Sequence, residues 1–176
     1  MGLFNRRSWG ARLPQVIRGA LELARGDRVL AFGVDDNTGC YIIATTFSLA
    51  VVTANAEPIV RRRWLSVDAG SWEPETATLT VTWADGRRAG QWSFRDQLTQ
   101  LPETLRERVQ ASVVIATRLN LGDRRTGRVA IRQDFETREL VPQTILGRYT
   151  RADDPEVQAH VVAALAHLKD QVGLLG

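Results

Sequence analysis

The sequence ATLTVTWADGRRAGQWSF, residues 77–94, predicts a β-hairpin around which the rest of the chain is arranged. Apolar residues alternate with threonines in its first half, which is the period of a strand with one buried face. Asp85-Gly86 favours a two-residue type I′ turn, because that turn needs φ > 0 at both positions. The turn places Leu79 opposite Trp92, and a shift of one residue would move Trp92 onto the threonine face. The pattern and the turn therefore predict the same register.

The composition is that of a soluble globular protein. The chain has 176 residues, 44% hydrophobic and 24% charged, and this length buries an adequate core without disulfides or metals. The single cysteine, Cys40, excludes an intrachain disulfide. No apolar run approaches the roughly 20 residues of a membrane span, and the N-terminus lacks the apolar core of a signal peptide. We therefore expect a soluble, cytoplasmic protein.

The basic residues are almost all arginine. Lys169 is the one lysine among 23 basic residues, and the net charge is +3. Arginine forks suit phosphate and guanine, so nucleic acid is one interpretation. The other is a GC-rich genome in which arginine replaces lysine throughout. The 20 acidic residues interspersed among the basic ones favour the second interpretation, since nucleic-acid binders usually have a more lopsided charge.

Short strands and turns dominate the chain after residue 28, and helices follow. Strands are expected at residues 29–34, 40–45, 49–53, 59–65 and 67–72, followed by the two hairpin strands. A helix beginning near Pro102 follows, then strands at 113–121, 128–134 and 140–149. The last helix has Asp154 as its N-cap and Pro155 in its first turn, and a short helix follows Pro14.

Two resemblances accompany this pattern. Residues 28–113 resemble bacterial pleckstrin-homology-like (PH-like) domains, in which seven strands and then one amphipathic helix follow each other. The segments that carry this resemblance are ATTFSL at 44–49, WLSV at 64–67 and the strand with its Asp-Gly turn at 79–86. The whole chain also resembles an uncharacterised actinobacterial family, through GDRVLA at 26–31, LPE at 101–103, RERV at 106–109 and DDP at 153–155.

The predicted fold class is α+β. Residues 1–25 form an N-terminal basic arm and a short helix. Residues 26–113 form the PH-like domain, a seven-stranded antiparallel bent sheet or barrel capped by a helix. Residues 114–176 form a β-β-β-α extension, packed on or beside that domain.

One loop departs from the PH-like pattern. Phosphoinositide-binding PH domains carry lysines and arginines between their first two strands. Here residues 35–39 read DDNTG, with two acids and no base. Like charges would repel an inositol phosphate, so phosphoinositide binding is not expected.

Arginine-rich turns supply the candidate binding residues. These are Arg61, Arg62, Arg63, Trp83, Arg87, Arg88, Arg124, Arg125 and Arg128. If they converge, they form a patch for phosphate or an acidic peptide, and Trp83 opposite Arg88 forms a cation–π contact. The other interpretation is that each turn is simply solvated, with arginine stems covering apolar surface.

No residue pattern indicates catalysis. His160 and His167 are the only histidines and lie seven apart, whereas zinc needs three or four ligands in defined geometry. Cys40 opens an apolar strand, where a thiol is usually inert. No nucleophile elbow, P-loop, dinucleotide fingerprint or zinc-protease motif occurs. We predict no catalytic or metal-binding residues and no cofactor.

The functional prediction is a non-enzymatic interaction or scaffold module. A PH-like body would bind a protein or peptide partner through its groove or an open strand edge, by strand addition or helix docking. The alternative is an accessory nucleic-acid-binding protein that uses the arginine-rich turns. Binding to DNA or RNA that survives physiological salt would favour the alternative.

Overall fold

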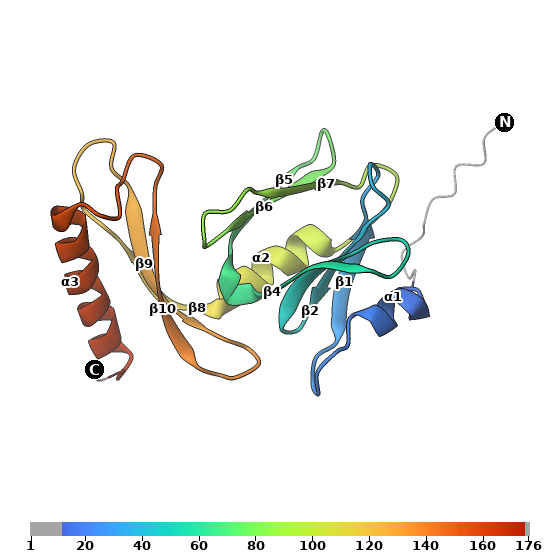
Figure 1. Ribbon diagram of the computed structural model, residues 1–176, viewed down its shortest axis with the longest axis horizontal. Helices are drawn as coiled ribbons and strands as arrows, with labels where there is room; N and C mark the ends of the chain where they lie inside the picture. Colours follow the sequence, from blue (N-terminus) through green and yellow to red (C-terminus); the bar gives the residue numbers. More distant parts are fainter. Residues whose placement is uncertain (1–11, 175–176) are drawn as a thin grey trace. The chain divides into compact units, whose positions relative to one another are not determined.

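The computed structural model describes residues 12–174 (Figure 1). The chain separates into two compact units, with the boundary between Gln110 and Ala111. Residues 1–11, which hold most of the predicted basic arm, lie outside the described range. Within that range, no helix is both long enough and apolar enough to cross a membrane.

Two antiparallel sheets form the first unit, after a short helix α1 (Gln15–Ala20). The first sheet contains β1 (Val29–Val34), β2 (Tyr41–Thr45), β3 (Ser48–Val52) and β4 (Pro58–Arg63), paired in chain order. The second contains β5 (Val67–Glu73), β6 (Thr78–Trp83) and β7 (Gly90–Ser93), also in chain order. Helix α2 (Leu101–Ser112) follows. The α+β class predicted from the sequence is confirmed, since residues 12–174 of the two units together form ten strands in three antiparallel sheets.

The predicted strand at residues 59–65 ends early. Strand β4 stops at Arg63, and Trp64–Ser66 forms a 3-10 turn. Trp64 is buried, and its indole N–H donates to the carbonyl of Thr45 at 3.0 Å. Burial of this large ring draws the chain out of the first sheet and leads it into β5.

The opening hairpin has the predicted register and a different turn. Leu79 pairs with Trp92, as expected. Of the two turn residues only Gly86 has a positive φ, of 72°, so the type I′ prediction is wrong. The Asp85 carboxylate accepts the backbone N–H of Arg87 at 3.1 Å, and this Asx-type contact stabilises another loop conformation.

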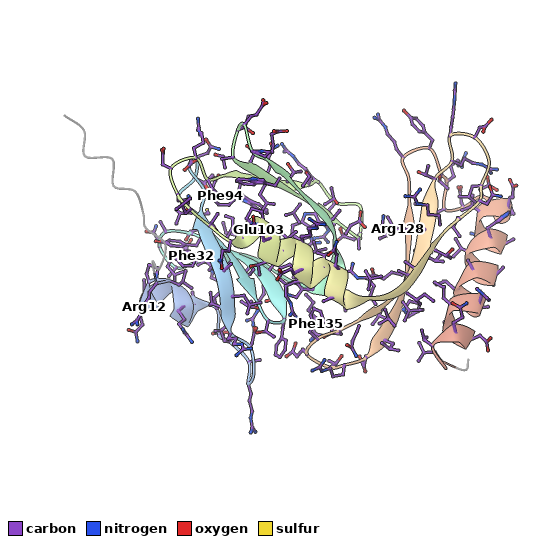
Figure 2. All side chains as sticks on the ribbon, turned by 180° about the vertical axis from the view of Figure 1, so that it is seen from behind. Arg12, Phe32, Phe94, Glu103, Arg128 and Phe135 are labelled. Atoms are coloured by element: carbon purple, nitrogen blue, oxygen red, sulfur yellow. The ribbon has the colours of Figure 1, made fainter. Side chains whose placement is uncertain are left out.

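Phe94 links the two sheets of the first unit. It is buried (labelled in Figure 2). Its ring lies so close to Gly33 of β1 that a β-carbon there would come within 2.7 Å of ring carbon Cε1. Trp72 of β5 stacks on the same ring with centroids 6.4 Å apart. Helix α2 contacts β5, where the Leu105 side chain lies against Gly70, and the turn between β2 and β3, where Arg108 donates to the Thr46 carbonyl at 3.0 Å.

The second unit is a three-stranded antiparallel sheet with a helix on one face. Its strands are β8 (Val113–Arg118), β9 (Gly127–Gln133) and β10 (Leu140–Leu146), in the order β10-β9-β8. Helix α3 (Pro155–Gln171) packs on one face of this sheet (Figure 1). Its Val157 and Leu168 join Val129 and Ile131 in one core. The predicted N-cap is confirmed, since Asp154 accepts the Glu156 N–H at 2.9 Å.

Strand β10 ends before the predicted residue 149. The Gly147 N–H donates to the Thr126 carbonyl at 2.7 Å, and the Thr150 N–H donates to the Gly147 carbonyl at 3.0 Å. The Thr150 hydroxyl donates to the same Thr126 carbonyl at 2.7 Å. These bonds close a turn that leads to α3.

We predict that Gly70→Ala destabilises the first unit. The new methyl group would collide with the buried Leu105 side chain, and overpacking of this kind costs about 1–3 kcal/mol. Chemical denaturation measures the change in the free energy of unfolding. Ser71→Ala, at the neighbouring exposed position, is the matched control and should differ little from the natural protein. Equal stability of the two variants would contradict the proposed contact.

Candidate functional site

The hydrogen-bonding phase of the second sheet follows from one pair near its end. The Phe94 N–H donates to the Ala77 carbonyl at 2.9 Å. Bonding direction alternates along an antiparallel strand, so the odd-numbered residues of β6 bond to β7 and the even-numbered ones to β5. The bond from the Ala84 N–H to the Ser66 carbonyl, at 2.9 Å, agrees with this phase.

Two residues of strand β5 direct their backbone N–H and C=O groups away from β6. Ser71 pairs with Thr80 and Glu73 with Thr78, and these even-numbered partners bond toward β5. Gly70 and Trp72 therefore direct their N–H and C=O groups away from β6. In the part of the chain that the structure describes, no strand pairs with β5 on that side. Residues 69–73 are all exposed.

Strand β7, at the other edge of the same sheet, is closed at Ser93. The Ser93 N–H donates to Asp35 Oδ1 at 2.9 Å, and the Ser93 carbonyl accepts the Asp36 N–H at 2.9 Å. Asp35 is buried and also accepts the backbone N–H and the hydroxyl of Thr38, at 3.0 and 2.6 Å. The acidic loop at residues 35–39 thus satisfies the outward backbone groups of Ser93.

The edge of β1 is sealed by side chains that follow the hairpin. Gln97 accepts the Val34 N–H through Oε1 at 2.8 Å and donates from Nε2 to the Val34 carbonyl. The Thr99 hydroxyl donates to the Phe32 carbonyl at 2.7 Å. Together they occupy the positions that a neighbouring strand would otherwise take.

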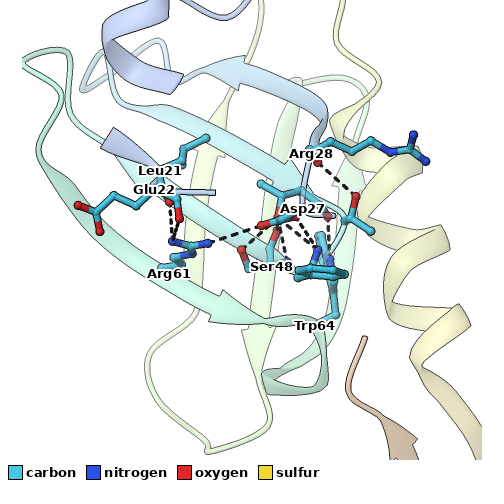
Figure 3. Close-up of polar contacts among 10 residues, drawn as sticks. Leu21, Glu22, Asp27, Arg28, Ser48, Arg61 and Trp64 are labelled. Atoms are coloured by element: carbon cyan, nitrogen blue, oxygen red, sulfur yellow. Dashed lines mark hydrogen bonds and ion pairs between the residues drawn. The ribbon is translucent and has the colours of Figure 1, made fainter. Parts of the chain in front are cut away.

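The edge of β4 is guarded by its composition. Pro58 has no N–H to offer, and the strand ends in three arginines, features that discourage pairing with another chain. Arg61 is also anchored, because its guanidinium donates to the Leu21 carbonyl and lies 3.5 Å from Asp27 Oδ2 (Figure 3). The Asp27 side chain is fully buried.

A hollow adjoins β5. It has a volume of about 420 Å³ and is lined mainly by hydroxyl, amide and carboxylate groups, among them Ser71, Glu73, Thr78 and Thr80. Among residues 12–174, no lysine or arginine lines it. Trp72 also lines it and is 37% exposed, so an aromatic surface lies beside the outward backbone groups.

The predicted residues of the first unit gather around Asp85. Arg62 Nη1 lies 2.9 Å and Arg87 Nε 3.4 Å from its Oδ2. The N–H of Arg87 and these two guanidinium groups hold the pKa of Asp85 below its usual value. Arg62 also lies over the Trp83 ring, 4.6 Å from its centroid. The predicted cation–π partner, Arg88, is wrong, because the Trp83 indole N–H instead donates to the Arg88 backbone carbonyl at 3.1 Å.

The remaining predicted arginines have different surroundings. Arg63 is exposed at the end of β4. Arg124, Arg125 and Arg128 belong to the second unit, where Arg124 is exposed and Arg128 is half-buried. Arg125 binds Asp154 at 3.3 Å and Glu156 at 2.8 Å, so it stabilises the start of α3.

Metal-binding groups are not gathered within residues 12–174. No cluster of three or more histidine, cysteine, aspartate or glutamate side chains there could hold an ion. His160 Nδ1 lies 2.9 Å from the Glu156 carbonyl, and His167 Nε2 lies 3.0 Å from the amide nitrogen of Gln171. Cys40 is half-buried.

The open backbone of β5 is not among the features that the sequence predicts. One signal could have indicated it: residues 69–72, AGSW, contain no proline, lysine or arginine to guard an edge. The exposure of the neighbouring edges could not be judged, because Asp35, Gln97 and Thr99 seal them from distant positions in the chain.

No protein-family model, curated protein or solved structure matches the chain.

We predict that Asp35→Ala opens the β7 edge. The change leaves the Ser93 N–H and the Thr38 donors without their acceptor, and each unsatisfied buried group costs about 1–3 kcal/mol. Amide hydrogen exchange should accelerate at Ser93 more than in the core of β6. Asp96→Ala, an exposed carboxylate nearby, is the control. Unchanged exchange at Ser93 would contradict the seal.

We predict that acid weakens the start of α3 through Glu156. The hydrogen bond from Arg125 holds the pKa of Glu156 below its ordinary value of 4.5. A depressed folded-state pKa contributes stability above the unfolded pKa, and this stability is lost as pH falls through the folded pKa. Glu156→Gln should therefore reduce α3 amide protection at about pH 7, and this reduction should shrink as the pH falls below the ordinary pKa of a glutamate. A reduction that does not change with pH would show that this ion pair has no role.

Proposed function

We propose that this chain is a non-enzymatic interaction module that binds an extended segment of a protein partner along β5. The observation that carries the proposal is the outward N–H and C=O of Gly70 and Trp72, exposed on a strand with one neighbour. An added strand would satisfy these groups through main-chain hydrogen bonds, which is the basis of recognition by strand addition.

The contrast with the other edges supports this assignment. In the first unit the outward groups of Val34 in β1 and of Ser93 in β7 are bound, and β4 carries Pro58 and three arginines. Natural sheets usually protect their edges, because an open edge pairs with other chains. In β5 the outward backbone groups would supply affinity for a partner strand. The exposed Trp72 and the hollow of about 420 Å³ beside it would supply selectivity through side chains.

The proposal includes a PH-like body for residues 26–113. Its support is the order of the elements, with a four-stranded sheet, a three-stranded sheet and then helix α2 following each other along the chain. Phosphoinositide binding is not part of the proposal, because the loop that would meet the headgroup carries Asp35 and Asp36. A cytoplasmic location is included on the strength of the lone cysteine.

Nucleic-acid binding remains the second candidate. Its support is the hairpin tip, where Arg87 is 74% exposed and Arg88 is also exposed. It is the weaker proposal, since Arg61, Arg62 and Arg125 already bind carboxylates within the protein.

Amide hydrogen exchange can distinguish strand addition at β5 from binding elsewhere. A displayed library of random linear peptides would be screened for binding to the full chain. The tightest-binding peptide would then be titrated into labelled protein. We predict new hydrogen-exchange protection at Gly70 and Trp72, because their N–H groups point outward, and little change at Ser71 and Glu73, which already bond to β6. Trp72→Thr keeps a good strand former and should weaken binding.

Two results would contradict the proposal. Protection confined to another exposed strand, such as β8, would place the partner elsewhere. The nucleic-acid alternative would be favoured by two results together. No peptide would be enriched, and the protein would retain random DNA at physiological salt unless Arg87 is changed to alanine.

A further inference from the structure

The β5 edge is acidic although the chain as a whole is basic. The net charge is +3, yet residues 64–86 contain Asp68, Glu73, Glu75 and Asp85 and no lysine, arginine or histidine. Asp85 is neutralised by Arg62 and Arg87 at the hairpin turn. The acids next to the open part of β5 are Glu73 and Glu75.

Both carboxylates are available to a partner. Glu73 and Glu75 are exposed, and Glu73 Oε1 accepts the Glu75 N–H at 3.4 Å. Within residues 12–174, neither side chain has an ion-pair partner. This end of β5 therefore presents negative charge that the described part of the protein does not compensate.

The alternation of side chains along an added strand determines which partner residues would lie opposite Ser71, Trp72 and Glu73. Successive side chains alternate between the two faces of a sheet, so Ser71 and Glu73 share one face and Trp72 lies on the other. Partner residues opposite Ser71 and Glu73 would face the hollow that Thr78 and Thr80 line. The partner residue between them would lie beside Trp72.

We infer that the partner segment is a basic strand, with lysine or arginine on the face that meets Glu73 and an apolar residue beside Trp72. This inference rests on the proposed strand addition at β5. The hydroxyl and carboxylate oxygens of the hollow accept hydrogen bonds from a cationic group, and opposite charges facing each other across strands are favourable. An acidic strand would meet like charge at the same positions.

Three synthetic peptides of equal length test the inference. Every second residue is lysine in the first, glutamine in the second and glutamate in the third, with valine and tyrosine between. Each is titrated into the labelled full chain while the amide resonances of Gly70 and Trp72 are followed. The lysine peptide should bind about two- to fivefold more tightly than the glutamine peptide, and the glutamate peptide more weakly than either.

A charge-reversal variant with a matched control locates the effect. Glu73→Lys should remove or invert the preference for the lysine peptide. Glu57→Lys makes the same charge change at an exposed position between β3 and β4 and should leave the preference largely intact. Equal losses in both variants would mean that net charge, and not the β5 edge, sets the preference, and would overturn the inference.

The peptide series also separates this inference from the proposed function. If all three peptides shift Gly70 and Trp72 with equal affinity, strand addition stands and the basic partner is wrong. If none of them shifts these amides, the result counts against strand addition itself.

Discussion

Backbone groups at the edges of the sheets impose the main constraint on the first unit. Each edge strand directs alternate N–H and C=O groups outward, and these need a partner or water. Asp35 and Asp36 bind Ser93 of β7, and Gln97 binds both groups of Val34 in β1. At Ser93 and Val34 these groups take the place of a further strand. The open part of β5 is meaningful by contrast with these two positions.

Packing holds that open strand in place. Gly70 allows Leu105 of α2 to lie directly against the backbone, and Trp72 stacks on Phe94, which itself lies against Gly33. The residues that expose their backbone outward are thus fixed from the inner side of the sheet. A binding edge on such a rigid element loses little conformational entropy when a partner adds to it.

Charge is distributed differently from what composition suggests. An arginine-rich sequence indicates a basic surface, but Arg61, Arg62 and Arg125 bind carboxylates and carbonyls of the protein itself. Burial even lowers the pKa of Arg132 to about 10, where it donates to the Ser112 hydroxyl. Much of the arginine is therefore structural, and the open edge of β5 carries uncompensated acid.

Elements with local signals could be predicted from the sequence alone. Alternation and the Asp-Gly pair placed the hairpin strands and paired Leu79 with Trp92, and Asp154 marked the start of α3. The α+β class followed, since most strands and both longer helices could be located this way. The turn type, the partner of Trp83 and the open edge were decided only by tertiary structure. Arg62 reaches Asp85, and Gln97 reaches Val34, across long stretches of chain. Contacts between residues so far apart in the sequence depend on how the sheets pack. The local alternation of apolar and polar residues does not indicate that packing.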